Sequence, residues 1–139
     1  SYTNYQMKTE EKQQQLMKLQ YLQKHIEQIS EKTQEMNQQL LDISISKNAL
    51  IQIGQTKPGT SILTQVANGI FVKTTLENNE KLIVNIGADT TVEKTIPQVV
   101  EMLEEQEDKM QKHLMELEGM IEQYGSQAMQ QISVLEKEE

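Results

Sequence analysis

The chain has 139 residues, of which 36% are apolar and 4% aromatic, and its mean hydropathy is -0.62. Because this composition fills a broad spherical core poorly, we expect an elongated protein or one stabilised by partners. A net charge of -8 without any arginine disfavours nucleic acid and anionic membranes as partners. The absence of cysteine excludes disulfides, thiol catalysis and cysteine-based zinc sites.

The N-terminal segment SYTNYQMKTEEK lacks the basic-then-apolar order of a signal peptide. No apolar run approaches the roughly 18 residues that indicate a membrane span. We therefore expect a soluble, cytoplasmic protein with no membrane partner.

The first part of the chain carries apolar residues in steps of three and four, which are the a and d positions of a heptad repeat. We expect one coiled-coil helix over residues 1–53, ended by Gly54 as its C′ residue and by the Lys57-Pro58-Gly59 turn. The pattern loosens toward the N-terminus. The series is Leu19, Leu22, Ile26, Ile29, Met36, Leu40, Ile43 and Leu50, with Thr33 and Lys47 in the two slots it skips.

The middle of the chain reads as four short strands, at residues 61–66, 70–76, 81–86 and 90–94, with turn-forming residues between them. Two hairpins of this size are marginal alone, and their exposed edges favour aggregation. Several subunits are therefore expected to pair their hairpins in a shared β-barrel. The predicted oligomer interface consists of Ile70, Phe71, Val72, Leu82, Val84 and Ile86.

The last part, residues 95–139, predicts a second coiled-coil helix that opens with a capping box between Thr95 and Gln98. Pro97 is tolerated in the first turn of that helix. Glu107 and Gln131 occupy two core slots and are expected to weaken the seam there. The heptad series is Val100, Leu103, Met110, Leu114, Leu117, Ile121, Tyr124, Ala128 and Leu135.

The predicted fold class is mainly α: a long antiparallel coiled-coil hairpin with two small β-hairpins at its base, which contribute to an oligomeric β-barrel. Residue i of the first arm should face roughly residue 150 minus i of the second, as an estimate from heptad geometry. Both termini would lie at the distal end, and residues 1–139 would form a single domain, with residues 59–94 serving assembly.

The middle segment also carries the most specific pattern, reading NGIFVK at residues 68–73, LIVNIGA at 82–88 and VEKT at 92–95. This pattern resembles the α-class subunits of prefoldin, also called GimC. The order of heptad arm, four strands and heptad arm extends the resemblance over essentially the whole chain. One departure is LTQVANG at residues 63–69, where many α subunits read Leu-Val-Pro-Leu-Gly-Ala-Gly. It leaves the preferred partner subunit open.

The resemblance implies a hexamer of two α-class and four β-class subunits, with a double β-barrel from which coiled-coil tentacles extend. It also implies an ATP-independent molecular chaperone, a holdase, that captures unfolded polypeptides at the tentacle tips. These clients would pass to a group II chaperonin. A single-domain prefoldin subunit of this kind would need no cofactor.

Apolar residues near both termini depart from the heptad seam, and we expect them to contact clients. Methionine is flexible and suits a surface that accepts unrelated sequences. The alternative is that these residues widen the core stripe or cover a neighbouring helix. The client-binding candidates off the seam are Leu16, Met17, Tyr21, Met115, Met120, Met129, Ile132 and Val134, and the seam residue Leu135 is included with them.

No enzymatic site is expected. His25 and His113 lie beside core positions of separate arms, which favours solvated histidines over a metal site. The Glu-rich run at residues 104–108 reads as a solvated helix face, and no nucleotide-binding glycine motif occurs. The acidic surface is expected to promote solubility, with docking to a basic patch on a chaperonin as the alternative. The rival function is a structural or filament-forming coiled-coil scaffold. Self-assembly without β-class subunits also stays open.

Overall fold

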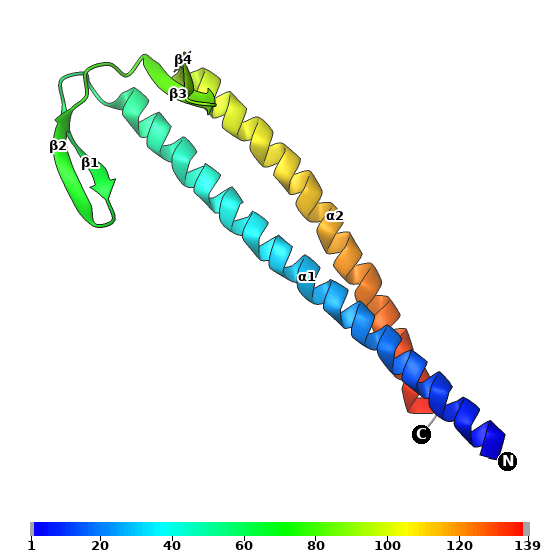
Figure 1. Cartoon of the computed structure of the whole chain (residues 1–139). Helices are drawn as coiled ribbons and strands as arrows, with labels where there is room; N and C mark the ends of the chain where they lie inside the picture. Colours follow the sequence, from blue (N-terminus) through cyan, green and yellow to red (C-terminus); the bar gives the residue numbers. More distant parts are fainter. Residues whose placement is uncertain (1, 138–139) are drawn as a thin grey trace. The chain divides into compact units, whose positions relative to one another are not determined.

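The computed structural model describes residues 2–137, so residues 1, 138 and 139 of the predicted arms lie outside it. The element order is α1 (Tyr2–Gln55), β1 (Ser61–Ala67), β2 (Ile70–Thr75), β3 (Lys81–Gly87), β4 (Thr90–Thr95) and α2 (Ile96–Lys137) (Figure 1). The mainly helical fold class with two strand pairs is confirmed. Within residues 2–137, neither helix has a stretch long and apolar enough to cross a membrane.

The chain divides into two compact units, which are described separately. One, here called the terminal unit, comprises residues 2–39 and 110–137 of the described chain. The other, here called the central unit, comprises residues 40–109. Each unit contains part of α1 and part of α2, and the four strands belong to the central unit.

In the terminal unit, α1 and α2 pack antiparallel along the predicted seam. Every core position of the heptad series in this unit is buried or half-buried, so the two-helix pattern is confirmed there. Ile29, Met36 and Leu117 form the buried cluster. The pairing follows the predicted offset, because the ring of His25 stacks on that of Tyr124.

The polar core residue Gln131 is only 7% exposed, and its Nε2 donates a hydrogen bond to the backbone oxygen of Gln15 across the helix pair (3.2 Å). In the central unit, Glu107 lies opposite Lys47, with 2.6 Å between Oε1 and Nζ. The two residues expected to weaken the seam therefore each have a partner. A buried polar group with a partner costs far less than one without.

The end of α1 differs from the prediction. Gly54 lies inside the helix, which continues to Gln55, so its assignment as the C′ residue is wrong. The side-chain amide of Asn79 instead donates to the carbonyl oxygens of Ile53, Gly54 and Thr56, at 3.3, 3.2 and 2.8 Å. Because the last carbonyls of a helix lack partners within it, this amide replaces the expected left-handed glycine cap.

The strands of the central unit form two antiparallel pairs, β1 with β2 and β3 with β4. Their bounds lie within about one residue of the prediction. Each pair has a register shift beside its turn, between Gln65 and Ala67 and between Asn85 and Gly87. The second turn places Ala88 and Asp89 at φ 48° and 59°, the positive values that a two-residue hairpin turn requires.

The start of α2 has the predicted capping box. The Thr95 hydroxyl accepts from the Gln98 backbone N–H (3.2 Å), and the Gln98 side-chain oxygen accepts from the Thr95 N–H (2.9 Å). Two backbone donors that the helix cannot satisfy are thereby paired. The next residue, Ile96, is buried and lies against Gly54, so the end of α1 meets the start of α2 in this unit.

Candidate binding surfaces

The terminal unit exposes most of the predicted client-binding residues. Met17 is 67% exposed and Met129 is 73% exposed. Leu135 differs from the rest, because it is half-buried in its heptad core position. The other exposed members of the predicted set are Leu16, Tyr21, Met115, Met120, Ile132 and Val134.

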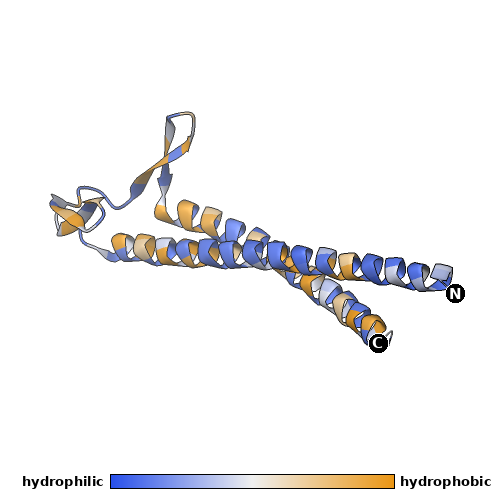
Figure 2. Cartoon of the chain, turned by 60° about the horizontal axis from the view of Figure 1, so that its bottom comes forward, coloured by the Kyte–Doolittle hydropathy of each residue, from blue (hydrophilic) through white to orange (hydrophobic). Residues whose placement is uncertain are grey.

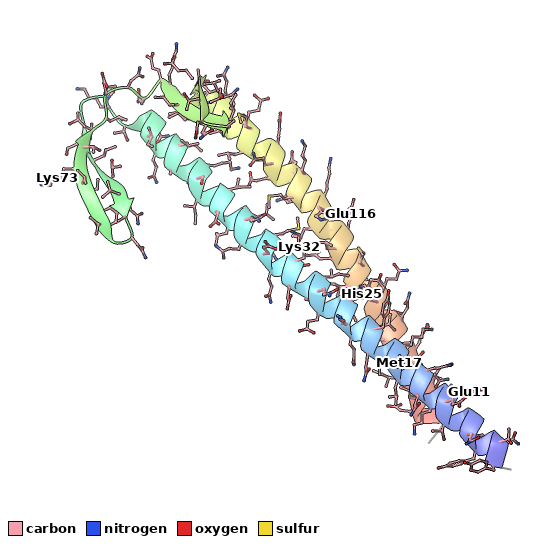
Figure 3. The ribbon with its side chains drawn as sticks, viewed as in Figure 1. Glu11, Met17, His25, Lys32, Lys73 and Glu116 are labelled. Carbon is pink, nitrogen blue, oxygen red and sulfur yellow. The ribbon has the colours of Figure 1, made fainter. Side chains whose placement is uncertain are left out.

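These side chains are not gathered on one face. By helical spacing, Met115 and Met129 lie on the outer side of α2, whereas Met120 and Ile132 flank the seam on opposite sides. Figure 3 places Met17 on the N-terminal part of α1. The terminal unit therefore offers dispersed apolar contacts around both helices rather than a single groove.

Three rings, those of Tyr21, His25 and Tyr124, form an aromatic cluster that joins α1 to α2 in the terminal unit. The ring of His25 meets Tyr21 edge-on, with centroids 4.4 Å apart, and stacks on Tyr124 at 5.6 Å. His113 is exposed, and its Nδ1 lies 3.6 Å from a carboxylate oxygen of Glu116. The two histidines thus have separate neighbours, and no group of His, Asp and Glu in residues 2–137 is placed to hold a metal ion.

Sequence reasoning missed two exposed aromatic residues near the N-terminus. Tyr2 and Tyr5 are both exposed on the first turns of α1. They precede the first heptad core residue, so the seam pattern does not include them. The available signal is their spacing of three residues, which places both side chains on one side of a helix.

The strand pairs of the central unit carry apolar side chains on both faces. Ile70, Phe71 and Val72 are consecutive and exposed, so they alternate between the two faces of their hairpin. In β3, Leu82 and Val84 are half-buried, while Ile83 on the opposite face is 77% exposed. Figure 2 shows hydrophobic residues along these strands. Three further apolar residues are exposed: Ile86, from the predicted interface set, and Leu63 and Val66, which lie outside that set.

Every strand is also an edge strand, because each sheet has only two members. Each strand therefore has a row of backbone donors and acceptors facing away from its partner. Edges of this kind pair with further strands, and the apolar faces gain by being covered. The arrangement is chemically suited to β-sheet assembly with other chains.

Comparison with known proteins supports this arrangement at the level of the family. A family model described as "Prefoldin subunit" matches residues 5–138. The chain belongs to the prefoldin family. It is 32% identical over 62 residues to a prefoldin subunit alpha from Thermofilum pendens, in line with the α class. That match covers 45% of this chain and 48% of the relative, about half of its length.

The fold of this prefoldin subunit is also similar to a solved structure, the filamentous PFD from Methanocaldococcus jannaschii determined by electron cryo-microscopy. The TM-score is 0.75 at 16% identity, covering 84% of this chain and 97% of the other. At that identity the similarity establishes the fold alone. The fold class predicted from the heptads and strands is thereby confirmed.

One feature of this prefoldin subunit lies outside the heptad prediction. In the central unit, three apolar residues of α1 that are not in the seam are exposed: Leu41, Ile45 and Ile51. Leu41 and Ile45 are one turn apart and lie on the side of α1 away from the core residues Leu40 and Ile43. The heptad pattern predicts only the seam, so it gives no information about this outer side.

Proposed function

We propose that this chain is a subunit of an ATP-independent chaperone, a holdase that captures unfolded polypeptides through the terminal unit. This proposal is supported by the exposure of apolar side chains, several of them methionines, around both helices of that unit. Such side chains adapt to unrelated apolar sequences without a defined pocket. Catalysis and cofactor use form no part of the proposed role.

Assembly is proposed to occur through the strand pairs of the central unit. Ile70, Phe71, Val72 and Ile86 supply exposed apolar surface, and Leu82 and Val84 supply half-buried surface. The expected partners are β-class prefoldin subunits, in a hexamer of two α and four β chains. Residues 1–139 would act as one prefoldin-like domain in the cytoplasm. Captured clients would then pass to a group II chaperonin.

The assembly step is tested by mixing the chain with a β-class subunit and measuring the mass of the product by light scattering after size exclusion. A species larger than either chain alone is expected, at the mass of two α and four β subunits. If the masses stay unchanged on mixing, the hexamer is wrong. If this chain alone forms the large species, self-assembly replaces it.

Client capture is tested by the aggregation of a chemically denatured enzyme on dilution, followed by light scattering without nucleotide. The triple substitution Met17→Gln, Met115→Gln and Met129→Gln should reduce suppression severalfold, because it removes outer apolar contacts without touching the seam. A matched control, Leu41→Gln with Ile45→Gln, removes exposed apolar groups from the central unit and should retain suppression.

A form trimmed of residues 1–18 and 122–139 should likewise lose suppression while still assembling. Equal protection by the trimmed and full chains would place client contact elsewhere. The rival function, a structural or filament-forming scaffold, predicts large assemblies and no suppression by any form. The same two measurements therefore separate the two functions.

A further inference from the structure

A groove of about 550 Å³ lies in the terminal unit, apart from the apolar contacts described above. Its lining comes from the first turns of α1 and the last turn of α2; Glu11, one of its residues, is labelled in Figure 3. The lining residues are Tyr5, Lys8, Thr9, Glu11, Lys12 and Lys137.

The groove is basic in an otherwise acidic chain. It contains three lysines and one glutamate, whereas the whole chain has a net charge of -8. Among the described residues, none of these three ammonium groups takes part in an ion pair. Lys8 and Lys12 are also four residues apart on one helix, where like charges repel each other. An anion bound between them would relieve that repulsion.

The spacing of the charges matches an extended peptide. Lys8 and Lys12 are separated by about 6 Å along the helix axis, at 1.5 Å per residue. Alternate side chains of an extended chain point to the same side and lie about 7 Å apart. A segment with acidic residues at every second position could therefore place one carboxylate near each lysine.

The remaining lining favours a polypeptide over other anions. Tyr5 is 72% exposed and offers an apolar ring beside the charges, which suits the side chains between the acidic ones. Nucleic acid, by contrast, would find no arginine in this chain to pair with its phosphates.

We propose that this groove binds acidic, extended segments of client polypeptides through Lys8, Lys12 and Lys137. The proposal rests on the proposed holdase function and adds a substrate class to it. Apolar segments would be held by the dispersed methionines, and acidic segments by the groove. Clients that combine both kinds of segment would be bound most tightly.

The test measures fluorescence anisotropy of a labelled peptide of alternating glutamate and serine with the assembled full-length protein. Lys8→Gln with Lys12→Gln should weaken binding about tenfold, since two charge-assisted contacts are lost. The control, Lys18→Gln with Lys24→Gln, changes two exposed lysines of the same helix and should stay near wild-type affinity. Lys8→Arg with Lys12→Arg keeps both positive charges and should bind the peptide with near wild-type affinity.

The proposal would be overturned if the wild type did not bind the peptide, or if both pairs of lysine substitutions weakened binding equally. Equal affinity for a glutamine-serine peptide would also overturn it. Tighter binding of a single-stranded oligonucleotide would reassign the groove to nucleic acid. Suppression of aggregation of an uncharged apolar client is measured in parallel. If suppression persists without peptide binding, only the acidic-segment proposal fails; if both are absent, the holdase function fails as well.

Discussion

The terminal and central units both expose apolar side chains, but of different kinds. In the terminal unit they lie on helices and include methionines such as Met17 and Met129. In the central unit they are largely β-branched or aromatic residues on strands, such as Val72 and Ile83. Methionine rotates freely and adapts to many partners, whereas β-branched side chains have few rotamers and pack against one defined surface. The difference suits variable ligands in one unit and fixed subunits in the other.

The largest effect is expected from placing charge in the strands of the central unit, which tests whether they contact other subunits. Val72→Asp with Ile83→Asp should abolish assembly with a β-class partner, because a buried carboxylate without a partner is strongly unfavourable. The mass after size exclusion measures the effect. Met115→Gln with Met129→Gln, in the terminal unit, should leave that mass unchanged. Assembly by the strand variant would show that the strands do not form the interface.

A smaller effect is expected at the end of α1. Asn79→Ala removes the amide that donates to three carbonyl oxygens, and it should lower the free energy of unfolding by about 1–2 kcal/mol. Thermal unfolding followed by circular dichroism measures the loss. Asn37→Ala, at an exposed position within the helix, is the control and should not destabilise. An unchanged melting temperature for Asn79→Ala would mean that water replaces the amide without cost.

The smallest effect concerns the pair between Lys47 and Glu107. The hydrogen bond to the Glu107 carboxylate raises the pKa of the Lys47 ammonium above its ordinary value of 10.5. Because the pKa is raised in the folded state, the contribution of the Lys47–Glu107 pair to stability is complete below pH 10.5. It is lost as the pH rises through the folded-state value. Melting temperatures between pH 8 and about pH 12 should therefore fall more for wild type than for Glu107→Gln. If the melting temperatures of wild type and Glu107→Gln fell equally with pH, the pairing of Lys47 with Glu107 would be contradicted.

The seam and the strands were predictable from sequence because their burial is periodic. Residues such as Leu22 and Leu117 recur every three or four positions, and that period follows directly from helix geometry. The cap from Asn79 was not predictable, since it joins residues 23 to 26 positions apart through a side chain that sequence reasoning places in a turn.

The basic groove was missed for a related reason. Lys8, Lys12 and Lys137 each read alone as a solvated lysine, and only the antiparallel pairing places the third beside the first two. Leu41 and Ile45 were missed because a heptad pattern carries no information about the outer side of its helix. In each case the missing information is a contact or an exposure that depends on the fold rather than on local spacing.

The contacts of Asn79 also have a consequence for local opening. A single side chain from the segment between β2 and β3 holds the final turn of α1, so the turn and that segment should open as one cooperative unit. In native-state hydrogen exchange, backbone amides at both places would then share one opening free energy. In Asn79→Ala they should exchange independently, with the helix end the faster of the two.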